Sequence, residues 1–306
     1  MKVSKNLAYA LMVLAAIMWA TSGTLTELAL DAGAEVLQVT LFQMIVSAMI
    51  LLPLIALLDP KSLKIRREDF WPLLAFSLIT GTFFSLAWYA CVERTGVATA
   101  VILLYSYPSI VVLSSVFLLR EKLGPEKAVA LPMTFVGCVL VAGAQDIQEG
   151  LSFDLIGVAL GIYTGVAAAV YYLWGKRFLA RYSANTLVLY MTLLSIPGLV
   201  IVANPLTVAD NPLGGMAWLY IFLLGLLPGS IGFLVSMVAL KQIEASRASI
   251  IASIEPVAAV LIAFAVLSQA LTAWQAVGVA LVFIAVLLIR LREEPEEAKQ
   301  AGPLER

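Results

Sequence analysis

The stretch SRASIIASIEPVAAVLIA, residues 246–263, matches an earlier stretch, ATAVILLYSYPSIVVLSS, residues 98–115, when the sequence is shifted by 148 positions. Most matched residues are aliphatic, and such matches are common in an apolar chain. Rarer residues also align: the proline pair Pro108 with Pro256 and, further upstream, the glycine pair Gly81 with Gly229. A proline and a glycine in register inside apolar segments predict that the chain contains an internal repeat.

The composition is that of a membrane protein. Hydrophobic residues make up 62% of the 306 residues and charged residues only 13%, with a mean hydropathy of +0.99. A soluble domain has about 25% charged residues, and so few charges could not cover its surface. The net charge of −1 argues against nucleic acid as a partner.

Ten apolar segments are long enough to cross a bilayer, which takes roughly 20 helical residues. They cover about residues 7–27, 35–58, 70–92, 96–119, 127–144, 155–175, 185–204, 216–240, 245–267 and 271–289. We predict helices because unpaired backbone groups are too costly in lipid and because the segments lack the period-two alternation of membrane strands.

The repeat divides the chain into residues 1–146 and 147–290, with five predicted spans in each half and a charged tail, 291–306, that we expect to be disordered. An odd number of spans requires the halves to be inverted in the membrane. The loop charges agree with inversion. The first half carries REKLGPEK at 120–127, where the matching loop of the second half, SQALTAWQ at 268–275, has no charge.

Lysine and arginine predict the orientation, because cytoplasmic loops are enriched in both. In the ten-span topology, 18 of the 19 basic residues lie on the side of the N-terminus, and Arg94 alone lies on the other side. We therefore expect a multi-pass protein of the inner (plasma) membrane with both termini in the cytoplasm.

Several kinds of chemistry are excluded or disfavoured. The sequence has no histidine, and its two cysteines, Cys91 and Cys138, belong to different predicted spans. These facts predict no enzyme activity, no metal site and no cofactor. The segment LPGSIG at 227–232 resembles the turn that carries the nucleophilic serine of some hydrolases. Because the chain has no histidine to act as the base, we interpret the segment as a contact between helices.

Three blocks resemble the EamA-like branch of the drug/metabolite transporter superfamily: AAIMWATSG around Trp19, YSYPSIVVLSSVFLLREKL at 105–123, and SIEPVAAVLIAFAVLSQAL at 253–271. The family favours Glu thirteen residues after each proline, which is Glu121 in the first block but Gln269 in the second. Gly278 matches the family, whereas its counterpart is Ala130. The resemblance implies ten helices in two inverted five-helix repeats around a central cavity. It also implies transport, often export, of small organic metabolites such as amino acids or related amphipathic compounds.

Glu255 lies about ten residues into its span, roughly 15 Å deep, near the middle of the bilayer. A charge at this depth is costly, so the side chain is expected to face the bundle interior or water. Three roles remain open for it: a protonated tie between helices, a contact for substrate, and a proton-coupling group. In the coupling role it would be protonated while its cavity is closed and would ionise when water enters.

Secondary transporters bind substrate near the midplane between their repeats. The candidate substrate-binding residues are therefore Trp19, Tyr89, Tyr105, Tyr107, Tyr163, Tyr171, Ser253 and Glu255, and the candidate kinks or hinges are Pro108, Pro256, Gly81 and Gly229. We expect a small-molecule substrate, the lipid bilayer and possible proton exchange as partners, in a monomer or homodimer. The alternative is a membrane protein that does not transport, such as a lipid scramblase or a sensor on the same scaffold.

Overall fold

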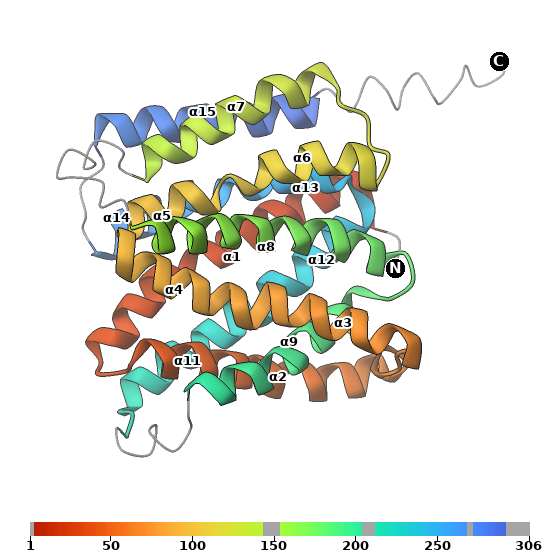
Figure 1. Cartoon of the computed structure of the whole chain (residues 1–306), viewed down its shortest axis with the longest axis vertical. Coiled ribbons are helices and arrows are strands. Elements are labelled where there is room, and N and C mark those ends of the chain that lie inside the picture. Colours follow the sequence, from red (N-terminus) through yellow and green to blue (C-terminus); the bar gives the residue numbers. More distant parts are fainter. Residues whose placement is uncertain (1–2, 143–153, 204–211, 268–271, 292–306) are drawn as a thin grey trace.

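The computed structural model describes residues 3–142, 154–203, 212–267 and 272–291. All regular elements in these ranges are helical. Figure 1 shows a bundle of long helices lying side by side, in which α1 (Lys5–Asp31) begins at the same end of the bundle as α15 (Ala273–Leu291) finishes. Gln269, residues 143–153 and all but the first residue of the tail predicted to be disordered, 291–306, lie outside the described residues.

The first half continues from α1 through a series of helices and helical turns. These are α2 (Val36–Leu58), η1 (Pro60–Leu63), η2 (Arg67–Asp69), α3 (Phe70–Ser77), η3 (Leu78–Phe83), α4 (Phe84–Thr95), α5 (Val97–Leu104), α6 (Tyr107–Leu118) and α7 (Pro125–Val141). The second half repeats much of this order with α8 (Leu155–Leu179), α9 (Ala184–Ala203), α11 (Gly215–Leu226), η5 (Leu227–Gly232), α12 (Phe233–Gln242), α13 (Ala245–Ala252), α14 (Ile254–Leu267) and α15.

Nine helical stretches within the described ranges are long and apolar enough to span a membrane. They correspond to nine of the ten predicted segments. The fifth predicted segment, 127–144, corresponds to α7, whose 17 residues make it shorter than those nine. Its start is set by Pro125, which suits the first turn of a helix because that position needs no backbone donor.

Two spans contain a π-helical turn, and these turns occupy matching places in the two halves. One is η3, which contains Gly81, and the other is η5, which contains Gly229. The segment LPGSIG at 227–232 is this second turn, so it forms part of a span rather than a turn that carries a nucleophilic serine. Wide turns of this kind leave room beside the backbone and are frequent at functional sites.

Each π-helical turn contacts a serine of the other half. The Ser47 and Ser230 hydroxyls are 3.0 Å apart, and the Thr82 hydroxyl donates to the Ser195 carbonyl at 2.7 Å. The shift of 148 that aligns the prolines also relates Ser47 to Ser195 and Thr82 to Ser230. A β-carbon at Gly81 would overlap the Ser195 side chain, so the close approach requires glycine there.

Two further spans, Val97–Leu118 and Ala245–Val266, are broken part-way along their length at matching positions. The first break, at Tyr105 and Ser106, separates α5 from α6, and the second, at Ser253, separates α13 from α14. Each break comes just before a proline, Pro108 or Pro256, in the first turn of the following helix. The structure therefore gives each proline the role of a helix start, because a proline there forfeits no hydrogen bond.

The first segments of the two broken spans, α5 and α13, are packed to different extents. The entire helix α13 is buried, and it packs against α6 and α7 of the first half. By the 148 shift, α5 corresponds to α13, yet α5 is half-exposed and has no comparable packing with α14 or α15. The broken spans therefore converge at the end of the bundle where α13 begins and are less tightly packed at the opposite end.

The helices α7 and α15 lie side by side along one edge of the bundle (Figure 1). Glycines allow this close approach: a β-carbon at Gly278 would lie 2.6 Å from the Gly137 carbonyl oxygen and 2.9 Å from Leu140 Cβ. Contacts through small residues are the usual means by which membrane helices approach closely. This pair joins the last described helix of each half.

Candidate functional site

Glu255 lies in the first turn of α14, directly after the break at Ser253. An acidic side chain is favoured there by the positive end of the helix dipole. Protein surrounds the carboxyl group, and the Tyr105 hydroxyl lies within hydrogen-bonding reach of it. The residue as a whole is partly exposed. Glu255 therefore faces the interior of the bundle and not lipid.

A continuous row of aromatic rings leads away from this carboxyl group. Tyr105 and Tyr107 have ring centroids 5.8 Å apart, and Tyr107 stacks on Tyr172 at 5.5 Å with the ring planes 4° apart. Tyr172 meets Tyr171 edge-on at 5.2 Å, and Tyr171 meets Trp19 edge-on at 6.0 Å. Such distances and orientations are typical of favourable aromatic pairs. We call these five rings, together with Phe233, the aromatic row.

Phe233 closes the far end of the aromatic row, 5.4 Å from Trp19 and 5.7 Å from Tyr171. The Tyr171 hydroxyl shares a hydrogen bond with Ser236. Trp19 Nε1, by contrast, is a buried donor with no hydrogen-bond partner in the described part of the chain. Buried donors are nearly always satisfied, so this N–H group is available to an acceptor that the protein itself does not supply.

Ser253 lies at the break itself, fully buried, and its hydroxyl donates to the Ser249 carbonyl at 3.2 Å. The Tyr107 hydroxyl donates to the same carbonyl at 3.3 Å. The break in one half is thus joined through Ser249 to the aromatic row that begins in the other. Six of the predicted residues are assembled here: Trp19, Tyr105, Tyr107, Tyr171, Ser253 and Glu255.

A second polar cluster lies where the broken spans converge. Lys127, which is 1% exposed, contacts Glu244 at 2.7 Å and Glu121 at 3.9 Å. Arg247, which is also buried, contacts Glu244 at 3.0 Å and Glu126 at 3.2 Å. We call these five residues the charge cluster. It links the start of α7 with the start of α13, and therefore links the two halves.

Glu121 adds backbone contacts to the charge cluster. Its carboxylate accepts from the backbone N–H of Ala245 at 2.7 Å and of Ser246 at 3.1 Å, and from the Ser246 hydroxyl. A carboxylate in this place satisfies free donors of the first turn of α13 and complements the helix dipole. Arg247 also donates to the Ile289 carbonyl of α15 at 2.8 Å. The cluster is consequently hydrogen-bonded on several sides.

Residues 6–143 and 155–291 match the model of the EamA-like transporter family. The chain belongs to this family. It is 28% identical over 267 residues to an uncharacterised transporter of Archaeoglobus fulgidus, a match that covers 87% of this chain and 91% of the relative. It is 25% identical over 285 residues to the uncharacterised inner membrane transporter YicL of Salmonella typhimurium, covering 91% and 93% of the two chains.

A solved crystal structure shares the fold, with a TM-score of 0.79 and 18% sequence identity over 94% of this chain and 99% of the other. The sequence, the helical spans and the family together identify a multi-pass membrane transporter. No group of three or more potential metal ligands occurs among the described residues.

Two predicted site residues of this EamA-like transporter lie outside the aromatic row. Tyr163 donates through its hydroxyl to the Ile79 carbonyl at 3.2 Å, beside the π-helical turn η3. Tyr89 lies near the hydroxyls of Thr40 and Thr26. Neither ring has a described contact with the row, and both tyrosines have helix-to-helix partners instead.

Three members of the site were not predicted from the sequence: Tyr172, Phe233 and Ser236. Tyr172 directly follows Tyr171, and neighbouring residues on a helix point about 100° apart. The sequence analysis therefore placed only Tyr171 at the site. The structure uses both, because Tyr172 faces Tyr107 while Tyr171 faces Trp19. The two consecutive tyrosines at 171 and 172 were the sequence feature that could have indicated that both belong to the site.

Proposed function

We propose that this chain is a secondary or facilitative transporter for small amphipathic metabolites that carry an amine, such as amino acids or related compounds. The observation behind this proposal is the position of Glu255, a lone carboxyl group in mid-membrane beside a break in its helix and at the start of the aromatic row. A carboxylate can hold an ammonium group through a charge-assisted hydrogen bond. The faces of Tyr and Trp rings attract the same cation.

The cationic side chains support an amine rather than a polyanion as the substrate. The two buried cations, Lys127 and Arg247, both belong to the charge cluster and are neutralised by its acids. A sugar phosphate would need a free cation to replace its hydration, and none faces Glu255 in the described spans. The unpartnered Trp19 Nε1 offers one donor for a carbonyl or carboxylate oxygen of the substrate.

We further propose ten membrane helices in two inverted repeats, with α7 as the fifth, and transport by alternating access. The matched π-helical turns, the matched serine contacts and the matched mid-membrane breaks support the repeat. The unequal packing of α5 and α13 supports alternating access.

In this arrangement the cytoplasmic end is shut, and the charge cluster helps to hold it shut. Glu255 would exchange its proton or its substrate when the cavity admits water, and export is the direction that the family resemblance implies.

Transport assays in proteoliposomes test this proposal. Amino acids and the amines formed by removing their carboxyl groups form a matched panel, with a sugar phosphate as the contrasting substrate. We expect saturable transport of the amine-bearing compounds. Comparing each amino acid with its decarboxylated amine reports whether transport requires the carboxyl group of the substrate. Saturable transport of the sugar phosphate alone, or lipid scrambling without solute transport, would contradict the proposal.

The proposed orientation can be tested separately with single cysteines. Both native cysteines are buried, so background labelling should be low. With cytoplasmic termini, Gly214→Cys should react with an impermeant thiol reagent added outside intact cells, whereas Arg67→Cys should react only after the membrane is opened. Both positions are exposed, so access to the reagent depends on sidedness alone. The reverse labelling pattern would overturn the orientation.

A further inference from the structure

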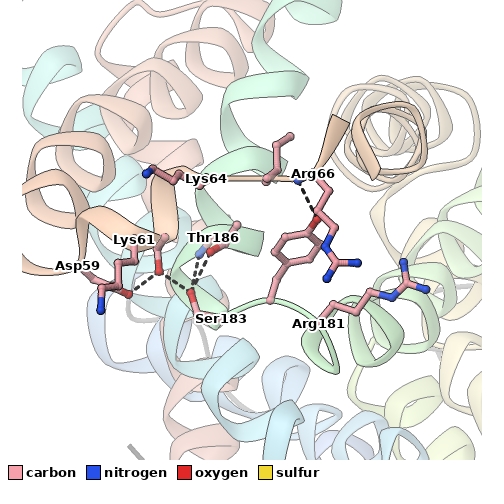
Figure 2. Close-up of a pocket in the computed structure, with 10 residues that line it drawn as sticks. Asp59, Lys61, Lys64, Arg66, Arg181, Ser183 and Thr186 are labelled. Atoms are coloured by element: carbon pink, nitrogen blue, oxygen red, sulfur yellow. Dashed lines mark hydrogen bonds between the residues drawn. The ribbon is translucent and has the colours of Figure 1, made fainter. Parts of the chain in front are cut away.

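A basic hollow of about 460 Å³ lies at one end of the bundle, away from the aromatic row. Figure 2 shows its side chains gathered around the segment that follows α2 and the turn between α8 and α9. Its lining residues are Asp59, Lys61, Ser62, Lys64, Ile65, Arg66, Arg181, Tyr182, Ser183 and Thr186. The hollow therefore joins segments of both halves.

The lining is strongly cationic. Four basic side chains, Lys61, Lys64, Arg66 and Arg181, face one acid, Asp59. Hydrogen bonds from Ser62 and Asn185 hold the pKa of Asp59 below its usual range, so this carboxylate stays charged. Lys61 interacts with it through space. The excess of positive charge consequently lies around Lys64 and the two arginines. Figure 2 shows Arg66 and Arg181 near one another on one side of the hollow and Lys64 on the other side, nearer Lys61.

These cations retain capacity to bind an anion. Lys64 forms no hydrogen bond or ion pair that lies within the described residues. Arg66 contacts Glu68 at 3.3 Å in an exposed pair, and Arg181 contacts Asp69 at 3.1 Å. A guanidinium group has five N–H donors, so each arginine keeps donors for a further partner. Two neighbouring guanidinium groups suit the oxygens of a phosphate, and the lysines across the hollow add positive charge.

The walls of the hollow are held in place by hydrogen bonds that do not use the side chains of these cations. The buried Ser62 hydroxyl bonds to Asp59 and also to Ser183, the latter at 2.7 Å. The Tyr182 hydroxyl donates to Asp69 at 2.6 Å and accepts from the backbone N–H of Arg66 at 3.2 Å. The two segments are thereby tied together, and the hollow is formed before any ligand arrives.

Lipid-facing side chains place the hollow at the level of the headgroups. Leu57 and Leu58, the last two residues of α2, are 82% and 76% exposed, and Trp71, in the first turn of α3, is 71% exposed. Tryptophan is enriched where the hydrocarbon meets the polar zone of a membrane. Along the chain, Leu58 directly precedes the lining residue Asp59, and Trp71 follows the lining residue Arg66 by five positions. Apolar residues next to a basic lining match the structure of a phospholipid, in which acyl chains adjoin a charged headgroup.

We propose that the hollow binds the phosphate of an anionic phospholipid, such as phosphatidylglycerol, whose acyl chains lie along α2 and α3. Basic pockets at the ends of membrane helices recognise headgroups in this way. The lipid would hold together segments of both halves at the end of the bundle opposite to the less tightly packed one. This site does not depend on the substrate proposed above, so the two proposals can fail separately.

Binding of short-chain lipids to the purified full-length transporter in neutral detergent tests this proposal. The probes are dioctanoyl phosphatidylglycerol, dioctanoyl phosphatidylcholine and glycerol 1-phosphate, which carries the phosphate without acyl chains. We expect the anionic lipid to bind at least about tenfold more tightly than the other two. The double variant Lys61→Gln/Lys64→Gln should weaken this binding about 25-fold, since each basic residue near an anionic surface contributes on the order of a fivefold change in affinity.

The matched control is Arg120→Gln/Lys122→Gln, which removes the same charge from exposed positions outside the hollow and should change the affinity less than about twofold. The thermal midpoints of both variants in phosphatidylcholine alone should equal that of the parent, because neither pair is buried. Equal binding of the anionic lipid by parent and Lys61/Lys64 variant would overturn the proposal. Equal binding of the two lipids would also do so. Glycerol 1-phosphate binding as tightly as the lipid would assign the hollow to a soluble phosphate compound instead.

Discussion

Glu255→Gln should lower the affinity for amine-bearing substrates by about 10- to 100-fold. The substitution keeps the size of the side chain and its ability to hydrogen-bond, but it removes the negative charge. A hydrogen bond to a charged group contributes about 1.5–3 kcal/mol, which corresponds to this range of affinity. Equilibrium binding of a labelled amine to the purified protein measures the effect directly. Gradient-driven accumulation in proteoliposomes should fall with it.

The same variant separates the three roles that the sequence left open for Glu255. If the residue couples protons without holding the amine, substrate exchange should survive while accumulation driven by a pH gradient is lost. If it is only a tie between helices, a folded Gln variant should bind and accumulate substrate like the parent, and that result would exclude both functional roles. Glu27→Gln, at an exposed position of α1, is the matched control and should behave like the parent.

Lys127→Gln should lower the free energy of unfolding by about 1.5–3 kcal/mol and open the end of the bundle that we propose to be cytoplasmic. Losing a charge-assisted contact costs about this much. The cost stays below that of an isolated buried pair because Glu244 is 39% exposed and keeps Arg247 at 3.0 Å. Here Glu244 loses its 2.7 Å contact and Glu121 its 3.9 Å contact. Ser253→Cys reports the opening: it should react with a thiol reagent from the cytoplasmic side in the Lys127 variant, but not in the parent.

The pH dependence of stability supplies a second readout of the charge cluster. Burial raises the pKa of Glu244, but hydrogen bonds and charges from Lys127 and Arg247 outweigh it, and the net pKa is lowered. A carboxylate with a lowered pKa stabilises the folded state above its unfolded pKa of about 4.3. This contribution is lost as the pH falls through the folded pKa. In Lys127→Gln the folded pKa should rise, so a smaller part of the stability should depend on pH in the acidic range.

Arg94→Gln is the matched control for the charge cluster. Arg94 pairs with Asp154 at 2.7 Å at the opposite end of the bundle, with both side chains partly exposed. Exposed pairs contribute about 0–1 kcal/mol, so this variant should unfold like the parent and leave Ser253→Cys protected from the cytoplasm. A Lys127→Gln protein with parental stability and no cytoplasmic labelling would show that the cluster does not hold this end shut.

The helical spans, the membrane location and the transporter family could be predicted from the sequence. The bilayer imposes a minimum length on every crossing segment and forbids unpaired backbone groups, so apolar length alone marks a span. The prolines just after the breaks in two spans were visible for a similar reason, because a proline constrains its own backbone whatever surrounds it. Glu255 was conspicuous because a carboxyl group in an apolar run is costly wherever the run packs.

The partners of these residues were decided only by the tertiary structure. In the sequence, Lys127 and Arg247 look like ordinary cations at the ends of spans, yet both are buried among acids that come from the two halves of the chain. Tyr172 and Phe233 join the site because α8 and α12 present them beside Tyr107 and Trp19. The basic hollow likewise combines segments more than a hundred residues apart. Local rules act on neighbours along the chain, whereas burial, pairing and enclosure depend on which distant helices pack together.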